Sequence, residues 1–298
     1  FRLLRPGAAA HLAGVRRAEL APVRVIEDGD VRTVVEALLG YGSSAVVLRY
    51  KIPRRGAEFE VEARVHWNEK DRLLKLLVPV TLRGGTYFGQ VAYGAQGLPG
   101  NGDEAVAQKW TAVIANDRTR ALTVVNDGVY GSDFQRQSLR LTLLRSPAYA
   151  GHPIHDRPIV PQDRYTPRID QGERLFRFWF DAGKADERLA RIEREALVKN
   201  EKPFAISFFP AGLGKKAQPF VMLSDDAVQM TAAKRAEDGK GLIVRLFEPT
   251  GHARNVTLSM PFCGLEREVS LAAFEIKTLR IDPSSGTMAE TDLLERAT

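Results

Sequence analysis

Alternation of apolar and polar side chains, with a period of two residues, is the feature that most constrains how this chain can fold. In Phe59–Trp67 the odd positions are apolar and the even positions are polar. A β-strand places successive side chains on opposite faces, so this segment predicts a strand with one buried and one exposed face. Leu139–Leu143 repeats the pattern, and Leu242–Phe247 is a more continuously apolar version of it.

Strand signals of this kind recur along most of the chain and are separated by short turns rich in glycine, asparagine and aspartate. The further predicted strands are Val31–Leu39, Ala45–Tyr50, Leu73–Val80, Ala121–Val125, Leu175–Phe180, Ala205–Phe209 and Phe274–Ile281. Many short strands with few helices are typical of an all-β sandwich. The pattern argues against a (β/α)8 barrel or a doubly wound sheet, in which strands alternate with helices.

One segment, Asp186–Lys199, has the pattern of a helix. Its apolar residues share one helical face: Leu189, Ile192, Ala196 and Leu197. The helix divides the chain into a predicted large β domain (residues 1–183), a helical connector (184–203) and a small C-terminal β-sandwich (204–282). The last residues, 283–298, show no periodicity and are predicted to form an irregular tail.

The composition is that of a folded protein with a substantial core, with 44% hydrophobic and 27% charged residues. No apolar stretch approaches the roughly 18–20 residues of a membrane-spanning helix, and the net charge of +6 arises from basic residues scattered among 37 acidic ones. We therefore expect neither a membrane nor a nucleic-acid partner. The single cysteine, Cys263, excludes an internal disulfide and favours a cytoplasmic location. Phe1–Pro6 lacks a starting methionine and the features of a secretory signal, so we expect a trimmed chain.

Short motifs for catalysis or metal binding are weak. Gly212–Lys216 lacks the glycine spacing of a phosphate-binding loop, and no nucleophile elbow occurs. His152, His155 and Asp156 have the donor types of a zinc site, but neighbouring prolines impose an extended path and no further ligand is secured. We therefore interpret these as surface loop residues, within an irregular, proline-rich stretch of residues 149–172, and predict no metal site in this chain.

Hydrolysis of a glycoside requires two carboxylates about 5–9.5 Å apart. The candidates beside turns or in the irregular stretch are Asp127, Asp133, Asp170 and Glu173. Each is interpreted as a turn or capping residue, so no catalytic residue is assigned.

Five longer blocks, in a fixed order, resemble one known family. They are Val65–Pro79, Gln108–Asp133, Leu139–Pro147, Asp170–Phe178 and Leu242–Arg280. Over about residues 22–282 the chain resembles the C-terminal β region of glycoside hydrolase family 38 α-mannosidases. One departure is notable: Arg174 stands where the family often has histidine in an Asp-x-Gly-x-His pattern.

The resemblance implies an all-β fold in which a galactose-mutarotase-like supersandwich is followed by a smaller β-sandwich, with one connecting helix. It also implies a parent enzyme that is a retaining, zinc-dependent α-mannosidase. In such an enzyme an N-terminal domain carries the nucleophile, the acid/base and the zinc, and the β region closes one wall of the active site. We therefore expect this chain to hold no cofactor, to have its own N-terminal catalytic domain and mannose-containing carbohydrate as partners, and to hydrolyse no mannoside alone.

Three residues are the predicted sugar contacts: Tyr130, Arg145 and Asp170. The turn Asn126–Gly128 is expected to place Tyr130 at a loop rim, and Arg145 ends an alternating strand. A half-buried tyrosine without a sugar, and an ion pair between Arg145 and a nearby carboxylate, are the alternatives. Trp67 and Trp110 lie on strand patterns and are interpreted as core anchors.

Two other functions stay open. The first is a stand-alone carbohydrate-binding module. The second is a mutarotase-like epimerase, which needs a histidine general base and a glutamate in one cleft. His66 and His155 are too loosely placed in the sequence to support that second function. The sequence leaves the oligomeric state open, and a homo-oligomer is one of the alternatives.

Overall fold

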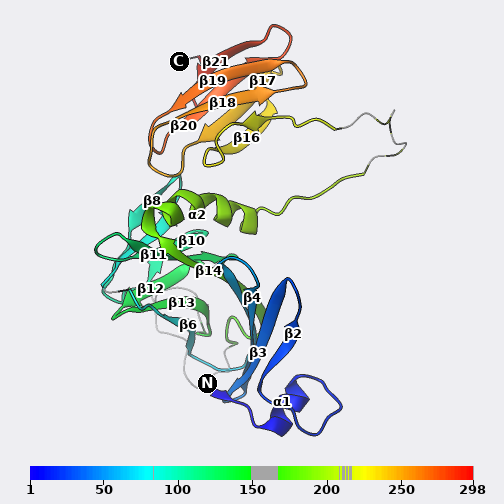
Figure 1. Ribbon diagram of the computed structural model, residues 1–298, viewed down its shortest axis with the longest axis vertical. Coiled ribbons are helices and arrows are strands. Elements are labelled where there is room, and N and C mark those ends of the chain that lie inside the picture. Colours follow the sequence, from blue (N-terminus) through cyan, green and yellow to red (C-terminus); the bar gives the residue numbers. More distant parts are fainter. Residues whose placement is uncertain are drawn as a thin grey trace. The chain divides into compact units, whose positions relative to one another are not determined.

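The computed structural model describes residues 1–82, 84–148, 167–207, 209, 212, 214 and 217–297. The chain divides into two compact units, Phe1–Gly89 with Gly97–Ala185 and Gln90–Gln96 with Asp186–Thr298. Both units consist mainly of β-strands (Figure 1), which confirms the all-β prediction.

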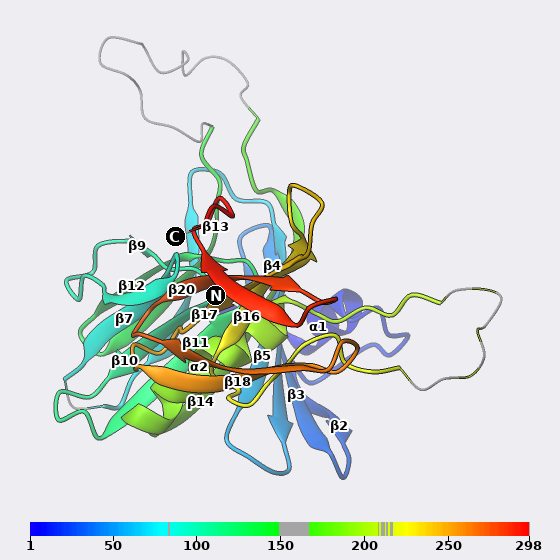
Figure 2. The same ribbon diagram turned by 90° about the horizontal axis from the view of Figure 1, so that it is seen from above.

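The larger layer of the first unit comes from a ten-stranded sheet, of which the end of β7 and most of β8 fall in the segment Gln90–Gln96. Its strands follow the order β1-β3-β4-β5-β14-β11-β10-β7-β8, with β2 paired to β3. Their bounds are β1 Arg2–Leu3, β2 Val23–Asp28, β3 Arg32–Tyr41, β4 Ser44–Pro53, β5 Phe59–Trp67, β7 Thr86–Val91, β8 Gly94–Gly97, β10 Trp110–Ile114, β11 Arg120–Asn126 and β14 Gly172–Lys184. Figure 2 shows β2, β3, β4 and β5 side by side.

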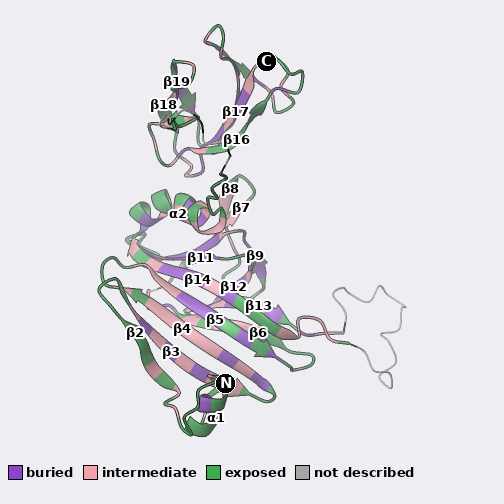
Figure 3. Cartoon of the chain, turned by 90° about the vertical axis from the view of Figure 1, so that its right-hand side faces the viewer, coloured by how far each residue is buried: buried purple, intermediate pink, exposed green. Residues whose placement is uncertain are grey.

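A four-stranded sheet is the second layer of this unit, in the order β6-β13-β12-β9. Its strands are β6 Leu73–Pro79, β9 Ala105–Val106, β12 Gly131–Gln135 and β13 Ser138–Arg145. One apolar core joins the two layers, because Val65 and Phe178 of the large sheet cluster with Leu139 and Leu141 of the small one. In the second half of β5, from Ala63 to Trp67, buried residues alternate with exposed ones, as the period of two predicted. Figure 3 colours the strands of this sheet by burial.

A short helix, α1 (Pro6–Leu12), was not predicted from the sequence. Seven residues are too few to show a repeating apolar face, so the pattern on which helix prediction relies is missing. The structure shows why the segment is helical: Pro6 occupies the start of the helix, where its missing N–H costs nothing, and Ala9 and Ala10 are buried.

The second unit contains α2 (Ala185–Asn200), which confirms the helix predicted for Asp186–Lys199. Its two sheets have the orders β15-β18-β19 and β16-β17-β20-β21. The strands are β15 Met222–Leu223, β16 Gln229–Arg235, β17 Leu242–Phe247, β18 Arg254–Met260, β19 Leu265–Leu271, β20 Ile276–Asp282 and β21 Thr287–Thr291. The sheets share a second core, in which Val244 and Ile281 cluster with Leu258 and Leu271.

Two predictions for the C-terminal part were wrong. Ala205–Phe209 forms no strand at its described positions, residues 205–207 and 209, and Ile206 and Phe209 are exposed. None of the described strands pairs with this segment, and an unpaired strand would leave its backbone hydrogen bonds unmade. The predicted tail, 283–298, contains β21, which pairs with β20. The Asp282 side chain accepts a hydrogen bond from the Ser284 amide at 2.9 Å and so supports the turn that begins this hairpin.

We expect Phe178→Ala to lower the free energy of unfolding of the first unit by about 3–5 kcal/mol, because it opens a cavity at a side chain that is 0% exposed. Leu175→Ala, on the same strand but 45% exposed, is the control and should cost less than about 1 kcal/mol. All three tryptophans, Trp67, Trp110 and Trp179, lie in the first unit, so tryptophan fluorescence during urea unfolding reports on it. Equal losses in the two variants would contradict the assignment of Phe178 to the core.

Candidate functional site

Three connecting segments meet at one end of the large sandwich. The turn after β5 contacts the segment after β13, since the Asp71 amide donates to the Ser146 carbonyl and the Ser146 amide donates to the Arg72 carbonyl, both at 2.8 Å. The segment that leads into β14 joins them, because the Gln171 side chain donates to the Glu69 carbonyl at 3.1 Å. We call the charged side chains gathered here the Asp170 cluster: Glu69, Asp71, Arg145, Arg168, Asp170 and Arg174.

Asp170 links the segment before β14 to the end of β13. Its carboxylate accepts hydrogen bonds from the Arg145 amide at 3.3 Å and from the Arg174 guanidinium at 3.2 Å. Its φ of 54° lies in the left-handed region, which aspartate tolerates better than most residues. The carboxylate stays partly exposed, so one side can still accept hydrogen bonds from a ligand.

Two further carboxylates of the cluster hold its loops in place. Arg168 donates two hydrogen bonds of 3.0 Å to Asp71, a bidentate geometry. Glu69 accepts from the Ser43 amide at 2.8 Å and the Ser44 hydroxyl at 3.0 Å, which ties the turn between β3 and β4 to the cluster. Glycine suits position 42, because its φ of 54° lies in the left-handed region and a Cβ there would lie 2.5 Å from the Glu69 carboxylate.

Trp67 connects the cluster to the core. Its side chain is 2% exposed, and its indole N–H donates to the hydroxyl of fully buried Ser146 at 3.1 Å. Trp110 is also 2% exposed, so the prediction of two core anchors is confirmed. The partner Ser146 was missed, since nothing in the local sequence indicates which hydroxyl lies beside a tryptophan about eighty residues away.

Arg145 and Asp170 are thus brought together, although through the Arg145 amide and not through its guanidinium. Tyr130 lies on the loop between β11 and β12 and is 46% exposed, in agreement with its predicted place at a rim. Within the described part of the chain no hydrogen bond or ion pair joins Tyr130 to the other two. Whether any of the three contacts a sugar stays a prediction.

The remaining carboxylate candidates pair with basic side chains. Asp133 is 1% exposed and is held by Lys75 and by Arg140, the latter at 2.5 Å. Asp127 lies 3.7 Å from Arg177. Asp133 lies within β12, so its interpretation as a turn or capping residue was wrong. Its burial still argues against a catalytic role, because an acid/base must be reached by its substrate.

A hydroxyl pair lies next to Asp133 in the core. The Tyr87 and Ser132 hydroxyls are 2.5 Å apart and both side chains are buried. Burial raises the pKa of Tyr87 to about 12, more than the Ser132 hydrogen bond lowers it. This phenol therefore stays protonated at neutral pH and serves the packing of the sandwich.

A metal site is not formed by the residues that the structure describes, since no three His, Cys, Asp or Glu side chains among them are placed to bind an ion. His152, His155 and Asp156 lie outside the described residues. Of the helices described here, none is long and apolar enough to span a bilayer.

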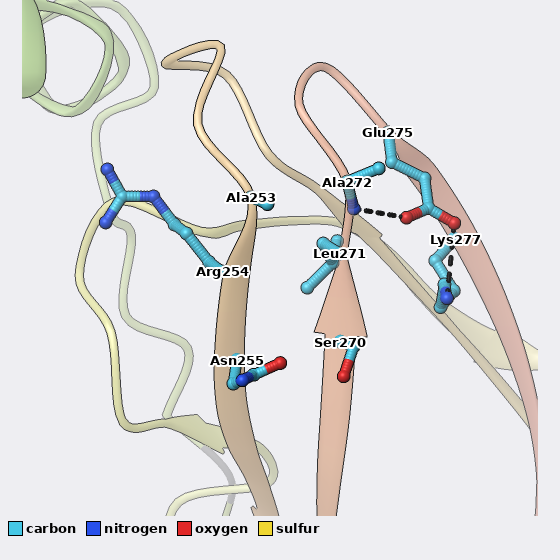
Figure 4. Close-up of a pocket in the computed structure, with 8 residues that line it drawn as sticks. All are labelled: Ala253, Arg254, Asn255, Ser270, Leu271, Ala272, Glu275 and Lys277. Carbon is cyan, nitrogen blue, oxygen red and sulfur yellow. Dashed lines mark hydrogen bonds and ion pairs between the residues drawn. The ribbon is translucent and has the colours of Figure 1, made fainter.

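The second unit contains a pocket of about 340 Å³ at the ends of β18 and β19 (Figure 4). Its charged side chains already have partners. Lys277 lies 3.2 Å from Glu275, and Arg254 points away from both and lies 2.8 Å from Asp225. We therefore interpret this pocket as a gap between packed loops and not as a ligand site.

Glu248 organises those loops. It is 0% exposed and accepts hydrogen bonds from the amides of Thr250, Gly251 and Phe274 and from the Arg254 guanidinium at 2.8–3.2 Å. Burial disfavours its charged form, but the hydrogen bonds from Thr250, Phe274 and Arg254 outweigh burial and lower its pKa.

Comparison with known proteins identifies relatives of both units. The family model "Glycosyl hydrolases family 38 C-terminal domain" matches residues 5–161, and "Glycosyl hydrolases family 38 C-terminal beta sandwich domain" matches residues 227–297. Alpha-mannosidase G of Dictyostelium discoideum is 26% identical over 289 residues, which cover 87% of this chain and 25% of that protein. The chain therefore spans about a quarter of the length of this curated relative.

Two solved structures from Enterococcus faecalis share the fold. One is an alpha-mannosidase from strain V583, with a TM-score of 0.68 and 17% identity, over 87% of this chain and 34% of that one. The other is a protein in glycosyl hydrolase family 38, with a TM-score of 0.68 and 18% identity, over 87% of this chain and 36% of that one.

We expect Glu248→Gln to destabilise the second unit by about 1–3 kcal/mol at pH 7, because an amide cannot satisfy all the donors around the carboxylate. The lowered pKa means that the charged form stabilises the fold above the ordinary glutamate pKa, and that this stability is lost as pH falls through the lowered value. The variant should therefore lose less stability than the unaltered chain between pH 7 and acidic pH. Calorimetric unfolding at several pH values checks this, with exposed Glu266→Gln as the control. An unchanged pH dependence in Glu248→Gln would refute the role of this carboxylate.

Proposed function

The chain belongs to glycoside hydrolase family 38, and we propose that it forms the C-terminal β region of a retaining, zinc-dependent enzyme that hydrolyses α-mannosides. The observation that carries the proposal is the pair of family 38 C-terminal matches, which follow one another along both β units. The α-mannosidases among the relatives support the substrate class. A cytoplasmic location is part of the proposal, supported by the free cysteine Cys263.

The zinc and the two catalytic carboxylates belong, in this proposal, to a preceding catalytic domain of the same protein. The described residues do not fit a zinc site, because no three suitable donors come together among them. Asp133, the most buried of the candidate aspartates, forms ion pairs with Lys75 and Arg140. The role left to this chain is to support the catalytic domain and to complete one wall of the active site.

The Asp170 cluster and Tyr130 are the parts of the chain best suited to such a wall. Sugar hydroxyls both donate and accept hydrogen bonds, so they bind well to a guanidinium, a carboxylate and a phenol. Arg145 and Tyr130 are exposed, and Asp170 is partly exposed on loops fixed by the Arg168–Asp71 pair. Fixed loops hold such side chains in place before the sugar arrives.

The 298-residue chain alone should not hydrolyse 4-nitrophenyl α-D-mannoside, since the proposal places every catalytic group outside it. The full-length parent should hydrolyse it, and a zinc chelator should abolish the rate, with recovery when zinc is restored. The measurement is release of 4-nitrophenol by equal molar amounts of both proteins. Zinc-dependent turnover by the short chain would overturn the proposed division of roles.

In the full-length parent, Arg145→Gln and Tyr130→Phe should each lower kcat/KM for the aryl mannoside by about tenfold, because each removes one hydrogen bond to the sugar. Arg136→Gln is the matched control: Arg136 is exposed in the β12–β13 turn, at the opposite end of β13 from Arg145. Steady-state kinetics with melting temperatures distinguish lost contacts from lost folding. If all three variants behave alike, the wall does not lie at Arg145 and Tyr130.

A further inference from the structure

The outer face of the ten-stranded sheet, which points away from the core, carries a row of ion pairs across its strands. Glu36 on β3 accepts from the Arg24 guanidinium at 2.5 Å and from the Arg49 guanidinium at 2.9 Å. Arg49 on β4 also reaches Glu62 on β5 at 3.4 Å. Glu36 is 3% exposed and Glu62 8%, so these side chains form an ordered polar floor.

A pocket of about 270 Å³ lies over this floor, on the same outer face. The end of α1 forms one side of it, through Leu12 and the following Ala13. Leu38 of β3 and Val47 of β4 add aliphatic surface beside the ion-paired residues. The volume is slightly below the range of about 300–1,000 Å³ that suits drug-sized ligands, so the pocket fits a smaller molecule.

Three polar side chains at the other side of the pocket can form further hydrogen bonds, those of Arg64, His66 and Glu173. His66 on β5 lies directly opposite Glu173 on β14 in the strand register, so both side chains share the outer face. The Arg64 guanidinium is 3.7 Å from Glu173, an ion pair too long for a hydrogen bond. Among the residues that the structure describes, the His66 imidazole makes no hydrogen bond, and the side chains of Arg64 and Glu173 are held only by their mutual ion pair.

We propose that this pocket binds a single monosaccharide unit, through Arg64, His66 and Glu173. A ring with several hydroxyl groups and an aliphatic face matches a pocket in which donors and acceptors lie beside aliphatic side chains. A charged ligand is disfavoured, because the guanidiniums of Arg24, Arg49 and Arg64 are matched by the carboxylates of Glu36, Glu62 and Glu173.

The proposal does not rest on the function proposed above for the Asp170 cluster. Trp67, which adjoins that cluster, and Phe176 and Phe178 point into the core, whereas His66 and Glu173 point to the outer face. The pocket also brings together the histidine and the glutamate that the sequence left unconnected. The placement of His66 opposite Glu173 could not be foreseen, because it depends on β14 pairing with a strand about a hundred residues earlier.

Saturation-transfer NMR and isothermal titration calorimetry on the 298-residue chain test the proposal. The probes are methyl α-D-mannopyranoside, methyl β-D-galactopyranoside and inorganic phosphate. We expect saturable binding of at least one glycoside and no competition by phosphate. Glu173→Gln and Arg64→Met should each weaken binding about tenfold, because each removes a charged hydrogen-bonding group. Exposed Glu266→Gln, on β19 of the other unit, should leave the affinity unchanged.

The remaining outcomes would each overturn the assignment. No saturable glycoside binding, or binding that neither pocket variant weakens, would show that the pocket holds no sugar. Binding of phosphate alone would show an anion site.

His66→Ala provides a further variant, since His66 is exposed and its loss should leave the melting temperature unchanged while weakening glycoside binding. None of these outcomes depends on mannosidase activity, so the two proposals can fail separately.

Discussion

The pairing of β14 between β5 and β11 is the constraint on which the first unit depends. Without it, β3–β4–β5 and β10–β11 are separate sets of neighbouring strands, each formed from residues close in sequence. β14 joins them through thirteen residues, with Gly172 opposite Trp67 at one end and Lys184 opposite Arg120 at the other. Phe178 is then fully buried in the shared core. Closing such long loops costs chain entropy, which the buried apolar surface must outweigh.

The same strand positions both proposed ligand sites. The residues just before β14 form the Asp170 cluster, held by the amide of Arg145 and the guanidinium of Arg174. The first residues of β14 then alternate between faces, so that Glu173 faces the outer pocket beside His66. Two chemically different surfaces therefore arise within a few residues, because a strand presents successive side chains to opposite sides.

Charged residues on strands show where prediction from pattern is limited. The alternation in Phe59–Trp67 identified β5 with its correct bounds and the correct core face. It also implied that Glu62 is exposed, yet Glu62 is buried between Arg49 and Lys51. Burying a carboxylate is favourable only with charged partners, and those partners come from β4. Prediction of the site had the same limit: the exposure of Tyr130 followed from its turn, but the contact between Arg145 and Asp170 did not.

The sequence by itself determined the all-β class, about half of the strands that the structure describes, the helix α2 and membership of the family, because alternation, helical periodicity and the order of similar blocks are local or linear properties of the chain. Only the tertiary structure decided that Ala205–Phe209 is not a strand, that β21 completes a hairpin, and that His66 meets Glu173. Each of these depends on whether a partner strand is available and in which register it pairs. Register arises from the packing of the whole sheet, so no single segment encodes it.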